Sequence, residues 1–498
     1  MTARTAIREG DGAGAVSGAI WIALALVACL SVLLVNGRPL FYFDTVGYID
    51  QGQLILSKAG LYEMPVETTE ATTARSAEPV MRSADDKIAD GSRSMFYSVL
   101  MGGLAAAGVL EGLVLLHAGA VILGLWLAFT AMSRSAAAPF GVPAMIGIAC
   151  IAALPTSMPF FVAYLMPDIF VALLVLMIAM VTAYGRDMRW WEYGLAFCLG
   201  AVAIVSHLSH LAIAAALVPV VVIVALVLRR GTFWRALVFT LALIAVAFAQ
   251  QATIRAAASK VSDKEVIIRP FLTARLIQDG PGYDYLSERC PDPAYATCAL
   301  YEALQRSDDP WRLTASHIIF SHDEKLGSFK FLDADGQIAV ARDQVPFFLD
   351  VLKDRPLATT LAFVKNTLIQ TTMFSVDMTF PSDAILERHA GVEGLLFRPF
   401  GDGWLTAGDD AWLGRLTGAQ AVWYALALAV SLGIVLRPAG LPPQVRALAV
   451  VALMGILANA FVCGAISQPA SRYGARMIWL LPVIAAMLVM FRNAGRVR

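Results

Sequence analysis

The first residues that suggest chemistry follow the first hydrophobic segment of this 498-residue chain. That segment, residues 15–36, is long enough to cross the roughly 30 Å hydrocarbon layer of a membrane. The stretch Phe41-Tyr42-Phe43-Asp44 comes soon after it, so Asp44 is expected at the membrane surface, on the side opposite the N-terminus. A carboxylate there can act as a base or bind a metal ion. The alternative is an ordinary interfacial loop, since Tyr and Phe favour that layer.

A second carboxylate, Asp168, begins the fourth hydrophobic segment, again on the outward side. A charged group beside lipid is costly and usually has a partner or a function. The alternative is a helix cap, because an Asp at a helix N-terminus accepts backbone N–H bonds and suits the helix dipole. The sequence leaves both interpretations open for Asp168, and the two roles can coexist.

Two arginines lie at the outward boundary of the last hydrophobic segment. Arg472 and Arg476 are four residues apart, so they share one face of a helix. They also lie on the outward side, where the positive-inside rule disfavours basic residues. Because a guanidinium fork matches phosphate oxygens, a lipid phosphate or pyrophosphate is a natural ligand. The alternative is that both side chains snorkel toward lipid headgroups. We predict that this element, with Tyr473, binds substrate.

Four further polar residues on the outward side are candidates for substrate binding. His207 and His210 lie three apart at a turn, where two imidazoles can bind a metal or a phosphate. The alternative for this pair is a polar turn with its hydrogen bonds satisfied. Arg93 precedes Tyr97 by four residues and either helps to hold a phosphate or caps the loop. No Ser-His-Asp or Cys-His nucleophile arrangement can be argued from the sequence order.

The composition predicts an all-α polytopic membrane protein. Hydrophobic residues make up 58% of the chain and charged residues 15%, which is too apolar for a soluble multidomain enzyme. The balance of 38 basic and 38 acidic residues gives no reason to expect nucleic-acid binding. Windows of about 19 residues predict about ten transmembrane helices, the first of them retained rather than cleaved. They cover residues 15–36, 111–133, 141–156, 166–185, 193–208, 210–228, 235–252, 416–436, 446–465 and 474–491.

The distribution of arginines predicts the orientation of these helices. With the N-terminus inside, the inside loops carry basic residues throughout, as the positive-inside rule requires. The pattern holds only if residues 193–228 form two helices divided at 206–210. One helix there would measure about 54 Å and would invert every later loop. Both chain ends are then cytoplasmic, and residues 37–110 and 253–415 face outward.

The outward segments are expected to differ in structure. Residues 44–59 and 94–107 have apolar side chains at helical spacing and are predicted to be helices lying in the membrane interface. Residues 63–92, between them, carry few large apolar side chains and are expected to be mobile. Residues 253–415 are long enough for a small folded domain or a cap of helices. The predicted domains are residues 1–252, the N-terminal membrane domain; 253–415, the outward domain; and 416–498, the C-terminal transmembrane helices.

Two of the six cysteines are predicted to form a disulfide. Cys290 and Cys298 lie in the large outward segment and are separated by a short loop that contains proline. Such a pair in an oxidising compartment is a disulfide candidate. A zinc site would need four ligands, and the sequence has no second pair nearby. The other four cysteines lie in or beside hydrophobic segments and are small apolar residues there.

The chain resembles the GT-C superfamily of integral-membrane glycosyltransferases. The resemblance rests on Asp44 just beyond the first span, two interfacial helices in the first outward loop, Asp168 at the fourth span, and Arg472-Tyr473 near the last. It covers the membrane core, about two thirds of the chain. The paired acidic motif of some members is absent, since Thr45 follows Asp44.

The resemblance implies an enzyme that transfers a sugar from a polyprenyl-phosphate donor to a lipid, glycan or protein acceptor. The reaction would be inverting and would face the periplasm, in a bacterial inner membrane. Asp44 and Asp168 would be catalytic carboxylates or ligands of Mg²⁺ or Mn²⁺, with Asp44 removing the acceptor proton. Arg472 or Arg476 would stabilise the departing phosphate.

Two other classes of function stay open. One is an O-antigen ligase or polymerase, which relies on Arg and His rather than on an acidic base. The other is a transporter or flippase for lipid-linked sugars. That class predicts a polar path through the spans and two related halves. Few charges lie within the predicted spans, and the sequence shows no repeat of one half in the other.

Overall fold

A computed structural model describes residues 3–63, 87–135, 138–228, 231–262, 264–292, 295–321, 323, 325–377, 395–396, 403–407 and 410–496. Eight helical segments within these residues are long and apolar enough to cross a membrane. The expected all-α polytopic membrane protein is therefore confirmed. The eight are α1 (Ala3–Asn36), α6 (Gly112–Ser135), α9 (Phe170–Tyr184) with the preceding turn η1 (Pro167–Ile169), α11 (Leu208–Leu228), α12 (Phe233–Ser262), α20 (Ala411–Leu436), α21 (Pro443–Phe461) with η6 (Val462–Ser467), and α22 (Ser471–Ile478) with α23 (Leu480–Arg496).

The other two predicted spans correspond to shorter apolar helices. These are α7 (Val142–Ala153), which is followed by the short helix α8 (Met158–Ala163), and α10 (Trp190–Val205). At 1.5 Å per residue, α10 measures about 24 Å, somewhat less than the hydrocarbon layer. The division of residues 193–228 into two helices is confirmed, because α10 ends at Val205 and α11 begins at Leu208. The ten helices together are called the membrane block below.

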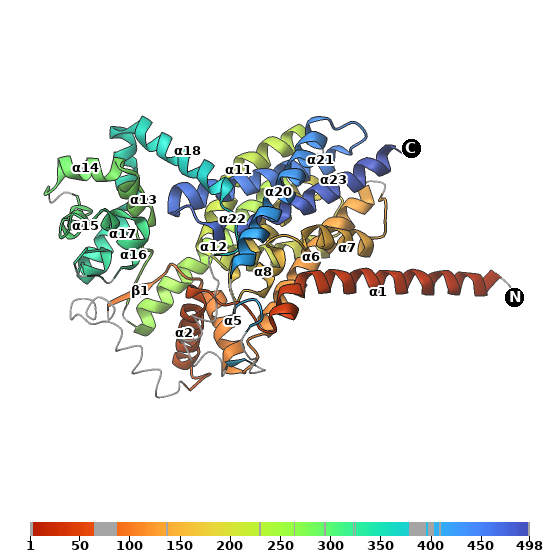
Figure 1. Cartoon of the computed structure of the whole chain (residues 1–498), viewed down its shortest axis with the longest axis horizontal. Helices are drawn as coiled ribbons and strands as arrows, with labels where there is room; N and C mark the ends of the chain where they lie inside the picture. Colours follow the sequence, from red (N-terminus) through yellow and green to blue (C-terminus); the bar gives the residue numbers. More distant parts are fainter. Residues whose placement is uncertain are drawn as a thin grey trace.

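The helices of the membrane block run roughly alongside one another (Figure 1). Helix α9 lies at their centre, with every residue from Phe170 to Tyr184 buried. It contacts α6, α10, α11, α12 and α21. A helix that is apolar on all sides can pack against protein or lipid, and here the neighbouring helices surround α9 completely. Asp168, in the turn η1 directly before α9, therefore lies in the interior of the block, at one of its ends.

Polar contacts at the opposite end of the block join four helices. Arg134, in the last turn of α6, donates to the Glu192 carboxylate at the start of α10 and to the Asp187 carbonyl at 3.3 Å. Arg235, at the start of α12, donates to the Gly185 carbonyl beyond α9 at 2.7 Å. The end of α6, the end of α9 and the starts of α10 and α12 therefore lie at one level.

Two short helices of the first loop pack closely beside the block. They are α2 (Phe43–Lys58) and α5 (Met95–Ala106), within a residue or two of the predicted helices. Gly52 and Gly102 face each other at the contact, where a Cβ on Gly52 would lie 1.9 Å from the Ser98 carbonyl oxygen. The helices are thus confirmed, and their place in the membrane interface stays a prediction.

The segment predicted to be mobile, residues 63–92, lies mostly outside the described residues. Its end differs from the expectation, because residues Ile88–Asp90 form strand β1. This strand pairs in parallel with β2 (Glu265–Ile267), with Ile88 opposite Glu265. The partner is more than 170 residues away, so no local pattern in residues 63–92 announces the strand.

The large segment that is predicted to face outward folds as helices around a core of their own. Residues 264–372, called the helical module below, include a buried cluster with Leu286, Leu300, Ile318 and Val351. The predicted Cys290–Cys298 disulfide is present and joins two of these helices. The elements after β2 are α13 (Phe271–Asp279), α14 (Pro281–Arg289), α15 (Cys298–Leu304), η2 (Pro310–Leu313), α16 (Ala315–Phe320), η3 (Phe329–Phe331), α17 (Ala334–Asp354) and α18 (Pro356–Thr372).

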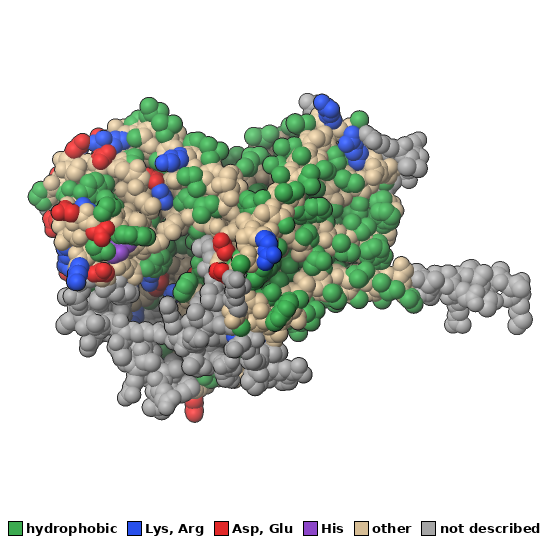
Figure 2. Space-filling view, in the orientation of Figure 1, with side chains coloured by type: hydrophobic (Ala, Val, Ile, Leu, Met, Phe, Trp, Pro, Cys, Tyr) green, Lys and Arg blue, Asp and Glu red, His purple; other side chains and the backbone are tan. Residues whose placement is uncertain are grey.

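The module and the block differ in surface as well as in position. The helices α13–α17 gather beyond one end of the block, and α18 leads back to it (Figure 1). Helices α1 and α23 extend toward the other end, so the two chain termini lie on the side away from the module. Figure 2 shows hydrophobic side chains spread over the block and charged side chains concentrated over the module. This division is expected where lipid surrounds one part and water the other.

Candidate functional site

Asp168 is fully buried and faces two arginines. Its Oδ1 accepts from Arg472 Nε at 3.1 Å and from Arg476 Nη1 at 3.3 Å, and its Oδ2 accepts from Arg472 Nη2 at 2.8 Å. No described backbone N–H donates to this carboxylate, so it does not act as the helix cap that the sequence also allowed. Asp168 is instead the buried counter-charge of the arginine pair, as its cost beside lipid requires.

Arg472 joins the two carboxylates predicted from the sequence. Its Nη1 donates to Asp44 Oδ2 at 2.8 Å while its other nitrogens hold Asp168. The Tyr42 ring also covers this guanidinium, with its centroid 4.3 Å from Cζ. Flat aromatic and bidentate carboxylate contacts suit arginine rather than lysine. Three segments far apart in sequence, namely α2, η1 and α22, therefore meet at one guanidinium.

Arg476 lies one helical turn further and is completely buried. Besides Asp168, it donates to Asn459 Oδ1 from Nε at 3.3 Å and from Nη2 at 3.1 Å, and to Ser209 Oγ at 2.9 Å. Its Nη2 also lies 3.1 Å from Cys463 Sγ. The two arginines share one helix face as predicted, but Arg476 does not snorkel to the surface.

Asp44, Asp168, Arg472 and Arg476 form one cluster, called the arginine cluster below, and Asp44 is its accessible member. Its side chain is 38% exposed, whereas that of Asp168 is 1% exposed. Its second oxygen, Oδ1, lies 3.6 Å from Arg93 Nη2 at the start of α5. The guanidinium of Arg93 also lies against the backbone of Gly47 in α2. Of the two carboxylates, only Asp44 can therefore meet a molecule that arrives from outside.

A second set of charges positions Arg93. Asp90, at the end of β1, lies 4.0 Å from Arg93 Nη1 and 2.9 Å from Arg269 Nη2. Burial alone would raise the pKa of Asp90, but Arg269 and the Ser92 backbone N–H together hold this pKa below its ordinary value. The helical module, through Arg269, thus contributes to the placement of Arg93.

Two small cavities adjoin the cluster. One has space for about one water molecule, roughly 20 Å³, and is lined by Asp168 and Arg472 together with the rings of Tyr42, Phe161 and Tyr164. The buried Tyr164 hydroxyl has no hydrogen-bond partner among the described residues. The second cavity brings Arg93 and His207 together, and its other polar lining residues are Ser92, Ser94, Gln250 and Gln251.

The predicted substrate-binding residues separate into two groups. His207 lines a cavity, and its Nδ1 lies 2.9 Å from Ser209 Oγ, the hydroxyl that also accepts from Arg476. Tyr473 stacks at 5.0 Å from the Arg476 guanidinium. By contrast, His210 and Tyr97 are both fully buried and line neither cavity.

The two interior residues make contacts within the helices. The hydroxyl oxygen of Tyr97 lies 3.2 Å from His117 Nε2. His210 Nδ1 lies 2.6 Å from the Ala203 carbonyl oxygen. Both contacts hold neighbouring elements together, and a substrate role for either residue stays untested.

The described residues do not provide a suitable metal site. They contain no group of three or more His, Cys, Asp or Glu side chains that could hold an ion. Asp44 and Asp168 share only Arg472, whose guanidinium takes the place that a cation between them would need. Mg²⁺ favours six oxygen ligands in octahedral geometry. This donor set does not fit the expected Mg²⁺ or Mn²⁺, and no step below passes through a metal.

Helix α18 of the module fixes the start of α22. The buried Gln370 side chain accepts from the Ala470 backbone N–H at 2.9 Å and donates to the Ala470 carbonyl at 2.9 Å. Two residues after Arg472, a Cβ on Gly474 would lie 1.8 Å from the Met373 carbonyl oxygen. The module therefore holds the helix that carries both arginines.

Several members of the site were not predicted. Asn459 could have been found, because it is a polar residue within a predicted span and such residues usually have a partner there. Tyr42 lies two residues before Asp44 in the sequence, but that position alone does not predict that its ring covers Arg472. Asp90, Arg269 and Gln370 have no local signal, since their partners lie in distant parts of the chain.

A scan against protein-family models, a search of curated proteins and a search of solved structures find no match to this chain. The chemistry of the site is therefore inferred from its geometry.

Proposed function

We propose that this protein is a GT-C-like membrane glycosyltransferase that transfers a sugar from a polyprenyl-phosphate donor to a hydroxyl of a lipid, glycan or protein acceptor. One observation carries the proposal. An accessible carboxylate, Asp44, and a buried arginine pair anchored by Asp168 lie together where the membrane block meets the helical module. A donor with a long lipid tail can reach such a place from the bilayer.

Asp44 would act as the general base. The acceptor oxygen forms a bond to the anomeric carbon while the bond from that carbon to the phosphate oxygen breaks. The acceptor proton passes to the Asp44 carboxylate, and the phosphate leaves with the bonding electron pair. Attack from the face opposite the phosphate inverts the anomeric centre. The partial exposure of the Asp44 side chain supports this assignment.

The ion pair between Asp44 and Arg472 supports a role for phosphate as a switch. In the described arrangement, Arg472 Nη1 donates to Asp44 Oδ2 at 2.8 Å, so this carboxylate oxygen is already engaged. A donor phosphate that takes this Nη1 would release Asp44 as a base. Asp168 would meanwhile hold Arg472 through its other nitrogens, and Arg93 would add positive charge for the departing phosphate.

The contacts also favour ten crossings rather than eight. Asp168, before α9, belongs to the arginine cluster, and Ser209, at the start of α11, contacts it. The end of α6 and the end of α9 lie at the opposite level, with Arg134 and Gly185. After α6, the chain must therefore cross to the level of the arginine cluster through α7 with α8. After α9, it must cross to that level again through α10.

The orientation and the compartment are part of the same proposal. The arginine distribution predicts that the module is outside, and its disulfide suits an oxidising compartment. We therefore place the protein in a bacterial inner membrane, surrounded by membrane lipids, with the site facing the periplasm.

An O-antigen ligase or polymerase type of enzyme is the second candidate. The observation that favours it is the cavity shared by Arg93 and His207, since enzymes of that type rely on Arg and His. A transporter or flippase for lipid-linked sugars has no comparable support in the described residues.

The test is a transfer assay with the purified full chain and a panel of polyprenyl-phosphate sugars, in which release of polyprenyl phosphate is measured. Asp44→Asn is expected to lower the rate by roughly 10²-fold or more, the usual contribution of a general base. Asp50→Asn is the control, because Asp50 is an exposed carboxylate on the same helix. Turnover near wild type in Asp44→Asn, with loss in His207→Ala, would replace the proposal by the ligase-type alternative.

A further inference from the structure

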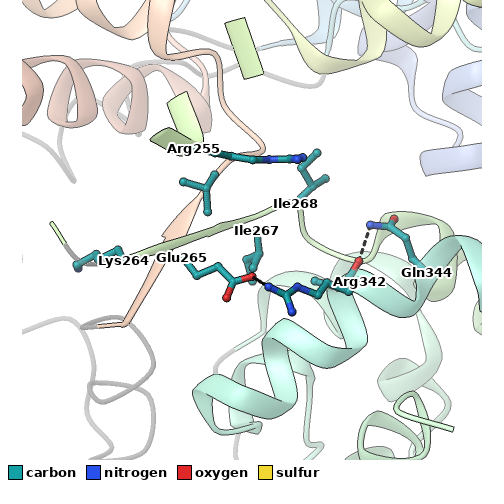
Figure 3. A pocket seen from close by; sticks show the side chains of 9 residues that line it. Arg255, Lys264, Glu265, Ile267, Ile268, Arg342 and Gln344 are labelled. Atoms are coloured by element: carbon teal, nitrogen blue, oxygen red, sulfur yellow. Dashed lines mark hydrogen bonds and ion pairs between the residues drawn. The ribbon is translucent and has the colours of Figure 1, made fainter. Parts of the chain in front are cut away.

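A larger cavity, of about 630 Å³, lies where α12 meets the helical module. We call it the basic cavity and define it by Arg255 from α12, Lys264 and Glu265 beside or in β2, and Arg342 and Gln344 from α17. Figure 3 shows Arg255 reaching across the end of β2 near Ile268, while Arg342 and Gln344 come from α17. Its volume falls within the range of about 300–1,000 Å³ that is usual for small-molecule sites.

Among the described residues, the lining of the basic cavity carries more basic than acidic side chains. Arg255, Lys264 and Arg342 contribute three positive charges, and Glu265 contributes one negative charge. That carboxylate is paired with Arg342 at 2.5 Å, whereas Arg255 has no ion-pair partner among the described residues. An excess of positive charge in a hollow attracts anions, and guanidinium groups match phosphate oxygens.

The cavity lies at the expected level of the membrane surface. The apolar run of α12 ends where Gln250 and Gln251 follow Ala249, and Arg255 lies about one turn further along the helix, which continues to Ser262. A basic side chain at this point meets the headgroup layer, where lipid-linked molecules carry their phosphates. The position therefore suits a phosphate group on a lipid-linked molecule rather than an anion deep in either solvent or lipid.

The cavity is also joined to the candidate active site. Its strand β2 pairs with β1, which ends at Asp90, and Asp90 contacts Arg93. Arg93 in turn faces Asp44. One strand pair and two ion pairs thus connect the lining of the basic cavity to Asp44.

We propose that the basic cavity binds a phosphate or pyrophosphate group of the acceptor substrate. That the bound molecule is the acceptor rests on the proposed function, whereas the binding of a phosphate group in the basic cavity does not. Arg255 and Lys264 bind the anion, and Arg342, already paired with Glu265, borders it. The accessible hydroxyl of the same molecule then approaches Asp44.

The experiment measures amide hydrogen exchange of residues 264–268 and 338–346 in the full chain, in dodecyl maltoside micelles that contain no phosphate. One arm adds inorganic pyrophosphate and the other adds short-chain phosphatidic acid. Both are expected to slow exchange, and tighter binding of the lipid would identify a lipid-linked source, while tighter binding of pyrophosphate would identify a soluble one. The variant carrying Arg255→Gln and Lys264→Gln should weaken binding by about tenfold or more, as expected for loss of charged hydrogen bonds.

The control is Lys353→Gln, since Lys353 is an exposed basic residue of the same helix α17 outside the cavity. It should bind both probes like wild type. Unchanged protection in the double variant would overturn the phosphate site. Asp44→Asn should keep the protection, so that full transfer activity in Asp44→Asn would overturn the proposed function and leave the phosphate site standing.

Discussion

At the scale of single residues, two carboxylates of one cluster have different tasks because they differ in burial. Asp168 is enclosed and neutralises two buried arginines, while Asp44 is partly exposed and holds one of them from outside. Removing one partner of a buried ion pair leaves an uncompensated charge, which is far more costly than losing an exposed pair. The difference separates a residue that builds the site from one that would react.

This difference predicts effects of very different size on stability. Asp168→Asn should lower the free energy of unfolding by about 3–5 kcal/mol, because Arg472 and Arg476 lose their buried counter-charge. Asp44→Asn should change it by about 1 kcal/mol or less. Thermal unfolding of the purified variants in detergent micelles measures both. Equal stability of the two variants would contradict the assigned roles.

At the scale of elements, the accessible carboxylate depends on how two short helices pack. Asp44 lies in the first turn of α2, and α2 is held against α5 by backbone contact at Gly52 and Gly102. Arg93, directly before α5, faces Asp44 across this contact. The distance between Asp44 and Arg93 is therefore set by the packing of α2 against α5.

Neighbouring glycines of α5 allow a matched test of that packing. A Cβ on Gly102 would lie 2.5 Å from the Gly52 carbonyl carbon, whereas a Cβ on Gly103 would meet no atom within 4 Å. Gly102→Ala should destabilise the protein by about 1–3 kcal/mol and lower transfer activity, because α2 must move. Gly103→Ala should be neutral or stabilise by up to about 1 kcal/mol, since Ala favours helix. The measurements are thermal unfolding and polyprenyl phosphate release. Identical behaviour of the two variants would refute the role of this contact.

The same elements indicate how far the sequence can predict the site. The helices α2 and α5, the break at 206–207 and the shared face of Arg472 and Arg476 follow from local periodicity and spacing. The contact of Gln370 with Ala470, and that of Asp90 with Arg269, join residues 100 or more positions apart. Such pairs depend on how helices and strands assemble, so no window of the sequence predicts them.

At the scale of the whole molecule, polar contacts gather at two levels of the membrane block. The arginine cluster joins α2, the start of α9, the start of α11 and α22 at one level. Arg134 and Arg235 join the other ends of α6, α9, α10 and α12 at the second. Helix α10 must bridge these levels although it is short, which a local thinning of the bilayer can accommodate.

This arrangement predicts which loops share a side of the membrane. With ten crossings, residue 138 after α6 and residue 190 at the start of α10 lie on the same side, because α7 with α8 and then α9 each cross once between them. With only the eight long helices crossing, residue 190 would lie on the side opposite residue 138. Ala138 and Trp190 are both exposed and suit labelling.

The measurement is single-cysteine labelling in membrane vesicles with an impermeant maleimide. Ala138→Cys and Trp190→Cys are placed in a chain carrying Cys198→Ala, which removes the exposed free cysteine. Both positions should react from the cytoplasmic side alone. Lys325→Cys, in the helical module, is the control and should react only from the periplasmic side under either count. Reaction of residues 138 and 190 from opposite sides would reduce the crossings to eight. It would also separate Asp168 from Asp44 across the membrane, which their shared contact with Arg472 does not allow.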